Sequence, residues 1–222
     1  MTYRRYAIYA TPDGKFAQLG AAWLGWDMHA GRAVAHPPDL DLSGATERPR
    51  RYGLHATLKP PMRLAPGSDA EGLSRAARAL AADLPPITID RLDVMTMGRF
   101  LALRPVDETA ALHEMAETFV RGLDTFRAAP SEDEVARRQN PRLSARQRAN
   151  LAQWGYPHVV QDFRFHITLT GPLRDAEPLR AQAQRHFAPV LSQPYTIDHV
   201  TLAAQDAQGF FHALERIPLG NL

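Results

Sequence analysis

Two short segments decide the expected fold of this chain: Leu54-His-Ala-Thr-Leu58 and Phe165-His-Ile-Thr-Leu169. Each segment alternates apolar and polar residues over five positions, which is typical of a β-strand with one face in the core. In each, the histidine and the threonine are two positions apart, so they share one face while the apolar residues take the other. The sequence therefore predicts two strands that each present an imidazole and a hydroxyl side by side.

The two segments stand in matching halves of the chain. Each is followed by a helical apolar pattern and then by a repeated Thr-Ile-Asp, at Thr88–Asp90 and at Thr196–Asp198. Similar segments, Gly98–Pro105 and Gly209–Pro218, close the two halves. Because both order and spacing are kept, we interpret the chain as an internal duplication.

The duplication predicts the fold class and the domain organisation. We expect a single α+β domain over residues 1–222, built as two lobes of roughly 1–105 and 106–222 that are related by a pseudo-two-fold axis. Mainly antiparallel sheets should face a central cleft, with the helices outside. The two histidine-threonine pairs would then face each other across this cleft from opposite walls.

Composition narrows the class of protein. The chain is 45% hydrophobic and 23% charged, as in an ordinary globular protein. No apolar run approaches the roughly 20 residues that span a bilayer, and no signal-peptide pattern follows the basic start, so we expect no membrane partner. The chain has no cysteine, which rules out disulfides, thiolate metal sites and cysteine nucleophiles and fits a cytoplasmic protein.

The charge balance bears on the expected partner. The chain has 26 basic and 24 acidic residues, for a formal net charge of +2. Binding a long RNA requires many phosphate contacts, so this balance favours a small-molecule substrate over RNA.

Paired imidazoles and hydroxyls suit phosphodiester chemistry. In-line displacement at phosphorus places the entering and leaving oxygens on opposite sides. One of His55 and His166 can remove a proton from the attacking water or hydroxyl, and the other can protonate the leaving oxygen. Thr57 and Thr168 can donate hydrogen bonds to the non-bridging oxygens. This mechanism requires no metal ion and no cofactor, and the sequence does not say which histidine is the base.

Four further residues are candidates for supporting roles. Lys59 should share the face of the first histidine and is expected to bind the anion, with a surface lysine at a strand end as an equal alternative. Thr170 and Arg164 share the face of the second histidine and are expected around the residues that contact the substrate. Tyr9 could line the cleft from the first strand, although a tyrosine there is more often part of the core.

A third His-x-Thr-Leu occurs at His199–Leu202. It follows the second Thr-Ile-Asp directly, so the counterpart of His199 in the first half is Arg91 and not the first histidine. We therefore interpret His199 as a structural residue or as part of the cleft rim.

Residues 131–155 have no counterpart in the first half. Ser131 with Glu134 and Ser144 with Gln147 have the spacing of capping boxes, so two short helices are expected. Five arginines make this insert basic: Arg137, Arg138, Arg142, Arg146 and Arg148. We interpret it as a solvated helical insertion, with a lid or substrate clamp near the cleft as the alternative.

The residues around both motifs resemble a known family. Two His-x-Thr motifs on a duplicated α+β fold are typical of the 2H phosphoesterases, which include 2′-5′ RNA ligase-like proteins and cyclic nucleotide phosphodiesterases. The flanking segments are similar to a poorly characterised branch that is associated with bacterial phosphonate utilisation. These segments are Arg5–Tyr9, Ala22–Gly25, Tyr52–Pro61, Trp154–Pro157 and Phe163–Gly171.

The resemblance implies both a site and an activity. It implies that His55 and His166 are the catalytic pair and that Thr57 and Thr168 bind phosphate. The implied activity is a cyclic phosphodiesterase-like hydrolase whose substrate is a nucleoside 2′,3′-cyclic phosphate or a ribose cyclic phosphate of a phosphonate pathway. Two alternatives remain: the processing of RNA ends, and a non-catalytic module that binds nucleotides or RNA.

Overall fold

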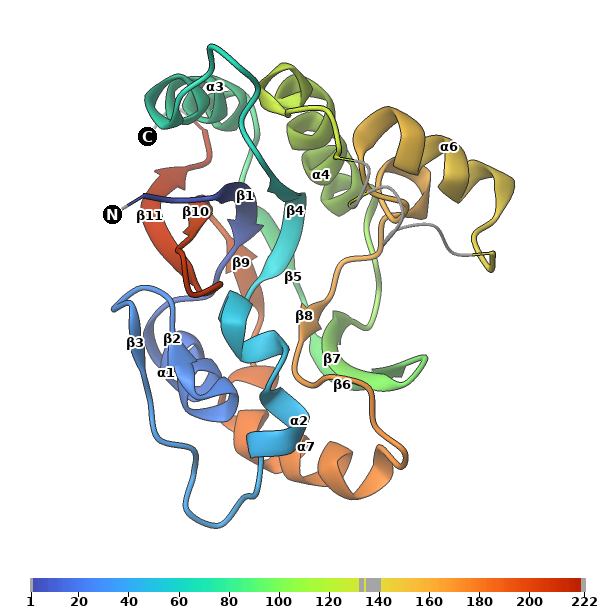
Figure 1. Ribbon diagram of the computed structural model, residues 1–222. Helices are drawn as coiled ribbons and strands as arrows, with labels where there is room; N and C mark the ends of the chain where they lie inside the picture. The colour runs from blue at the N-terminus through green and yellow to red at the C-terminus, as the bar shows by residue number, and fades with distance from the viewer. Residues whose placement is uncertain (1, 132–133, 135–140, 221–222) are drawn as a thin grey trace.

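The computed structural model describes residues 2–131, 134 and 141–220, and seven of their strands form one antiparallel sheet (Figure 1). The order of the strands is β11-β10-β1-β4-β8-β7-β6. These strands are β1 (Arg5–Ala10), β4 (Ala56–Met62), β6 (Leu92–Met97), β7 (Phe100–Pro105), β8 (Ile167–Thr168), β10 (His199–Gln205) and β11 (Phe211–Pro218). Two small antiparallel pairs join β2 (Trp26–Asp27) to β3 (Arg32–Ala33) and β5 (Ile87–Ile89) to β9 (Tyr195–Ile197). The expected α+β class with mainly antiparallel sheets is confirmed.

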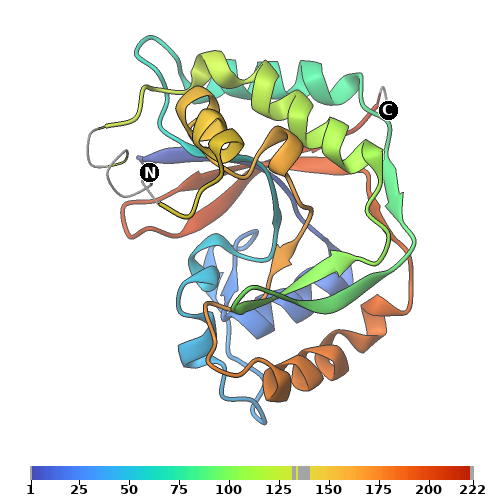
Figure 2. The same ribbon diagram turned by 90° about the vertical axis from the view of Figure 1, so that its right-hand side faces the viewer.

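The helices gather in two groups at opposite ends of the molecule (Figures 1 and 2). In one group α4 packs on β4 and α3 packs on β10 and β11, while in the other α7 packs on β6 and α1. The longer helices are α1 (Gly14–Leu24), α3 (Ala70–Ala82), α4 (Ala110–Gly122), α6 (Ala145–Trp154) and α7 (Glu177–Leu191). The short ones are α2 (Ser43–Thr46), η1 (Pro49–Tyr52), η2 (Asp124–Phe126) and η3 (Val160–Asp162). No helix within the described ranges is long and apolar enough to cross a membrane.

Helix α3 shows how the sequence produces these elements. Asp69 accepts a hydrogen bond from the backbone N–H of Gly72 at 2.7 Å and caps the first turn. Leu73, Ala77 and Ala81 follow at intervals of four residues, which places them on one face, and all three are buried. The same apolar core includes one face of the central strands, so the opposite face of these strands is left for the site.

The strands of each half of the sequence are not grouped together in the sheet. β10 and β11 of the second half extend β1 and β4 of the first, whereas β6 and β7 of the first half extend β8 of the second. The two parts meet at β4 and β8, which lie side by side in Figure 1 and share the registered pair Ala56–Ile167. The expected lobe boundary at residue 105 therefore does not coincide with a break in the sheet, because strands are exchanged between the halves.

The repeated Thr-Ile-Asp segments pair with each other. In β5 and β9, Thr88 is registered opposite Thr196, and Ile87 opposite Ile197. The two threonine hydroxyl oxygens are 3.0 Å apart. Equivalent segments of a duplicated chain meet in this way when a local two-fold axis passes between them, as the interpretation of the sequence requires.

Strand β4 continues past its expected end at Pro60. Its registered partners on β1 are Tyr9 for Thr57, Ile8 for Lys59 and Tyr6 for Met62, so β4 contains extra residues at two bulges. A bulge interrupts the ladder of backbone hydrogen bonds, which is where a proline lacking its N–H is tolerated within a sheet.

Candidate active site

The pairing of β4 with β8 brings the two predicted motifs together. Ala56 and Ile167, which are registered opposite each other, are both buried on the core side. The two histidines and two threonines flank this pair and point to the opposite face. In an antiparallel pair each histidine then lies across from the threonine of the other strand, with Cβ atoms about 4.5–5.5 Å apart. The pairs thus lie on neighbouring strands, which corrects the expectation that they occupy opposite walls.

These four side chains line an open cleft with two arms. Both arms include Thr57, Phe100, Tyr156 and His166. The first, which we call the aromatic arm, has a volume of about 530 Å³ and is also lined by Arg5, Tyr9, Arg48, Tyr52, His55 and Thr168. The second, which we call the basic arm, has a volume of about 630 Å³ and is also lined by Thr96, Met97, Arg104, His158 and Arg164. The four motif residues therefore share one cleft.

Three contacts fix the ring of His55. Its Nδ1 lies 3.0 Å from the carbonyl oxygen of Gly53, and its Nε2 lies 3.0 Å from the hydroxyl of Thr57. A carbonyl can only accept, so Nδ1 carries the proton and Nε2 accepts from the threonine. The ring of Tyr9 packs against the imidazole, with centroids 3.8 Å apart and planes inclined by 31°. His55 is therefore held as a neutral imidazole whose lone pair is on Nε2.

The carbonyl that orients His55 depends on a glycine. Gly53 has a φ of 71°, in the left-handed region that residues with a Cβ rarely adopt. A Cβ at this position would also lie 2.8 Å from the Cβ of Met28. Both the left-handed backbone conformation and the lack of room for a Cβ therefore restrict position 53 to glycine.

His166 is oriented in the same way. Its Nδ1 donates to the carbonyl oxygen of Arg164 at 2.7 Å, which leaves the lone pair on Nε2. The preceding residue, Phe165, is buried on the core side, and its N–H donates to Glu108 at 2.7 Å. Both imidazoles therefore use Nδ1 for a backbone carbonyl two residues earlier in the chain and keep Nε2 for chemistry.

Burial lowers the pKa of both histidines. The pKa of His55 falls to about 4, because loss of solvent outweighs the hydrogen bond to Gly53, and the charge of His166 lowers it further. The pKa of His166 is also lowered, mainly by burial and secondarily by Arg104, whereas its hydrogen bond to Arg164 and the charge of Glu108 act in the opposite direction. Within the described residues, no group of three or more histidine or carboxylate side chains is placed to hold a metal ion.

Three of the four residues expected in supporting roles occupy different positions around the cleft. Tyr9 is fully buried yet also borders the aromatic arm, so it belongs to both the core and the cleft wall. Thr170 borders the same arm, and its hydroxyl accepts the backbone N–H of Leu101 at 2.9 Å, which ties β7 to the segment after β8. The side chain of Arg164 is exposed and lines the basic arm. The contact of Arg164 with His166 is made by its backbone carbonyl, which accepts a hydrogen bond from Nδ1 of the imidazole.

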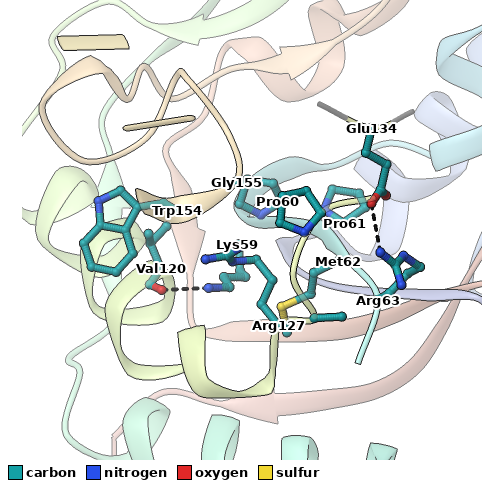
Figure 3. A pocket seen from close by; sticks show the side chains of 12 residues that line it. Lys59, Pro60, Pro61, Met62, Arg63, Val120, Arg127, Glu134, Trp154 and Gly155 are labelled. Atoms are coloured by element: carbon teal, nitrogen blue, oxygen red, sulfur yellow. Dashed lines mark hydrogen bonds and ion pairs between the residues drawn. The ribbon is translucent and has the colours of Figure 1, made fainter. Parts of the chain in front are cut away.

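Lys59 does not lie in the cleft. Its ammonium donates to the carbonyl oxygen of Val120 at 2.7 Å (Figure 3). It also donates to Asp124 at 3.1 Å, and the side chain is buried. The bulge after Thr57 adds one residue to β4, which turns Lys59 to the face that packs against α4. The prediction that Lys59 shares the face of the first histidine is wrong for this reason.

Replacing Lys59 by methionine should change the dependence of stability on pH. Burial lowers the pKa of Lys59 to about 8 from its ordinary value of 10.5. Between these values the unfolded chain holds a proton that the folded chain has lost, so this residue makes the free energy of unfolding rise with pH, by about 3 kcal/mol in total.

Denaturant unfolding of both proteins at several pH values measures this contribution. Between pH 8 and pH 10.5, the free energy of unfolding of the wild type should rise relative to that of Lys59→Met. A constant difference between them would show that the pKa of Lys59 is ordinary. Because the side chain lies outside the cleft, catalysis should be close to that of the wild type.

Arg104 is a site residue that the motifs do not reveal. Ala102 and Leu103 of β7 are registered opposite Thr168 and Ile167, so Arg104 follows across from His166 on the cleft face. In the sequence, the signal for it is an arginine that alternates with buried residues in a predicted strand. This alternation places Arg104 on the polar face of its strand. Its neighbour on the next strand follows only from the register between β7 and β8.

His199 is a structural residue, as interpreted from its position in the duplication. It is buried, and its Nδ1 lies 2.5 Å from Asp198 and 2.9 Å from Arg216. The threonine of the same motif, Thr201, is buried with its hydroxyl oxygen 2.6 Å from that of Thr11. Neither residue belongs to the lining of the two arms.

Both expected capping boxes of the insert have the predicted contacts. Ser144 accepts from the N–H of Gln147 at 3.1 Å, and Gln147 accepts from the N–H of Ser144 at 3.1 Å, at the start of α6. Ser131 and Glu134 exchange the same two bonds at 3.3 and 2.9 Å. The rest of the first expected helix lies outside the described residues.

Two of the described arginines of the insert make contacts within it or with η3. Arg146 pairs with Asp162 at 2.7 Å, and Arg148 donates to a backbone carbonyl of its own segment. Arg137 and Arg138 lie outside the described residues. These contacts fit the interpretation of a helical insertion.

Comparison with known proteins gives a family and two close relatives. The profile of a family described as "Protein of unknown function (DUF1045)" matches residues 57–212. A protein of Janthinobacterium sp. (strain Marseille), named ribose 1,5-bisphosphate phosphokinase PhnN, is 39% identical over 96% of this chain and 50% of its own length. A protein of the same name from Laribacter hongkongensis (strain HLHK9) is 36% identical over 86% of this chain and 46% of its own. The chain thus spans about half the length of these relatives.

Similar solved structures match nearly the whole chain at low identity. The crystal structure of TT0787 of Thermus thermophilus has a TM-score of 0.49 at 17% identity and covers 98% of this chain and 100% of that one. The apo form of E. coli LigT has a TM-score of 0.48 at 18% identity and covers 100% of both chains. Kluyveromyces marxianus Usb1 has a TM-score of 0.42 at 12% identity and covers 99% of both.

Proposed function

Because this chain belongs to the family described as "Protein of unknown function (DUF1045)", whose description names no reaction, we propose its function from the geometry of the cleft. The proposed function is that of a phosphoesterase that hydrolyses a small cyclic phosphodiester by general acid–base catalysis with His55 and His166. The observation that carries this proposal is the pairing of β4 with β8, which sets both imidazoles on one face of the sheet, each with the lone pair on Nε2.

His55 is the proposed general base. Its Nε2 already carries a lone pair, and its pKa of about 4 keeps it unprotonated at neutral pH. As water attacks phosphorus, Nε2 takes the proton of the water while the new P–O bond forms. Since Thr57 donates to this nitrogen in the free protein, its hydroxyl must turn to the substrate when the anion binds.

His166 is the proposed general acid. The bond between phosphorus and the leaving oxygen breaks as the protonated Nε2 of His166 gives its proton to that oxygen. A bound phosphodiester anion favours the imidazolium that this role requires, as does the carboxylate of Glu108. Thr57 and Thr168 donate hydrogen bonds to the non-bridging oxygens, where negative charge develops. The product is a phosphomonoester on an opened ring.

The name of the relatives supports a sugar phosphate as the substrate. It specifies ribose 1,5-bisphosphate, which carries two phosphomonoesters. Hydrolysis of a cyclic phosphodiester on a phosphorylated ribose yields a ribose with two phosphomonoesters, so such a reaction would supply a kinase of this type. We therefore propose a ribose cyclic phosphate, consistent with the resemblance to a phosphonate-associated branch, ahead of a nucleoside 2′,3′-cyclic phosphate.

Phosphorus NMR of reactions with either cyclic phosphate in excess chelator tests this proposal. Phosphodiester signals should be replaced by phosphomonoester signals with the wild type but not with a variant in which both histidines are alanine. Binding of the cyclic phosphates without product formation would favour the non-catalytic alternative instead.

The proposed roles predict an acidic pH optimum for kcat/KM. Below pH 4 His55 becomes protonated and can no longer act as the base. Above the pKa of His166, which lies below its ordinary 6.5, the acid is lost. Initial rates at low substrate concentration should therefore be highest between pH 4 and pH 6.5. An optimum above pH 7.5 would contradict these roles.

A further inference from the structure

The basic arm contains an arginine whose hydrogen-bonding capacity is only partly used. Continuation of the β7–β8 register by one residue places Arg104 across from His166, and Arg104 borders the basic arm. One Nη donates to Glu108 at the long distance of 3.3 Å. Its Nε is buried and has no hydrogen-bond partner among the described residues. The Arg104 side chain is nevertheless 25% exposed and borders the arm, so a ligand there can accept hydrogen bonds from the exposed part of its guanidinium.

The carboxylates near the basic arm are engaged elsewhere. Glu108 also accepts from the backbone N–H of Phe165 at 2.7 Å and lies 3.5 Å from His113. Asp162 is bound by Arg146 through contacts of 2.7 and 3.1 Å. Arg104 and Arg164 both line this arm, whereas Asp162 is the acidic side chain of its described lining, so positive charge exceeds negative charge there. The complementary ligand is an anion.

This anion is distinct from the phosphodiester between the two histidines. That phosphate is already surrounded by two imidazoles and two hydroxyls on β4 and β8. Arg104 is on β7, one strand farther from His55, and neighbouring strands are about 4.8 Å apart. Arg104 lines the basic arm, whereas His55 lines the aromatic arm. Two arginines line the aromatic arm. Arg5 is four residues from Tyr9 along β1, about 13 Å away, and its Nε donates to Gln205 at 2.7 Å, whereas Arg48 is exposed.

We propose that Arg104, with the basic arm, binds a second anionic group of the substrate, so that the preferred substrate is a cyclic phosphodiester that also carries a separate phosphomonoester. This inference rests on the proposed function for its catalytic consequence. The guanidinium is suited to the role because its planar fork can donate two hydrogen bonds to one phosphate. A phosphomonoester, with nearly two negative charges, matches an arm with several basic side chains better than a singly charged group does.

Two compounds that differ in one phosphate test this inference: adenosine 2′,3′-cyclic phosphate and its 5′-phosphorylated derivative. The wild type should have the higher kcat/KM for the 5′-phosphorylated compound. Arg104→Gln should lower the ratio of the two kcat/KM values by about 10- to 100-fold, as expected for loss of a charged hydrogen bond to the extra phosphate. Arg104→Lys should restore part of the preference. Arg91→Gln, which removes an exposed arginine outside both arms, should keep all of it.

Equal losses on the two compounds in Arg104→Gln would overturn the inference, because Arg104 would then act at the scissile phosphate or on folding. Binding to the His55→Ala variant, measured by calorimetry, separates this failure from failure of the proposed function. If the wild type hydrolyses neither compound but the extra phosphate tightens binding only when Arg104 is present, the inference holds and the proposed function fails. If both compounds bind equally with and without Arg104, the inference fails even where hydrolysis is observed.

Discussion

Replacing His166 by alanine should lower kcat for a cyclic phosphodiester by about 100- to 10,000-fold, and His55→Ala should have an effect of the same size. Each histidine performs one of the two proton transfers, so neither can replace the other. The loss should appear in kcat, because the threonine hydroxyls still bind the phosphate. The double variant should be little slower than either single one, since residues that act as a unit are not additive.

His199→Gln is the matched control for these variants. It removes the histidine of the third His-x-Thr-Leu segment. This histidine contacts Asp198 and Arg216 outside the cleft. Its kcat should be close to that of the wild type, and thermal unfolding of all variants identifies any that are merely destabilised. A folded His55→Ala or His166→Ala protein that keeps most of its activity would remove that histidine from the mechanism.

Replacing Thr168 by valine should lower kcat by about 100- to 1,000-fold, the range found when one donor to developing charge is removed. Valine keeps the shape of the side chain and removes the hydroxyl, so the change tests the hydrogen bond itself. Thr57→Val should have a comparable effect, because the two hydroxyls are related by the pairing of β4 with β8.

The conservative variants Thr168→Ser and Thr57→Ser separate the hydrogen bond from packing. Serine keeps the hydroxyl, so most of the activity should return. If the valine variants keep most of the wild-type activity while the serine variants are slow, the methyl group and not the hydroxyl matters, and the proposed contact with the non-bridging oxygens is wrong.

The sequence reveals the site largely because the motif is short and repeated. His55 and Thr57 are two residues apart, so no error in long-range structure can separate them from the same strand face. Repetition of the pattern at His166 then indicates which histidines belong together, and the position of His199 within the repeat excludes the third copy.

Features that depend on register between strands could not be predicted in the same way. Lys59 is two residues beyond Thr57, but one bulge reverses its direction, and nothing in the local pattern marks that bulge apart from the prolines that follow. Arg104 becomes a neighbour of His166 only through the pairing of β7 with β8. The sheet order depends on strand exchange between the halves, which similarity between repeats does not encode.

Crystals of the protein grown with inorganic orthovanadate, which adopts the five-coordinate geometry of phosphoryl transfer, test the central claim most directly. The account predicts one vanadate on the cleft face of β4 and β8, with the Nε2 atoms of His55 and His166 within hydrogen-bond distance of opposite apical oxygens. A vanadate that contacts one imidazole while the other lies out of reach would contradict it.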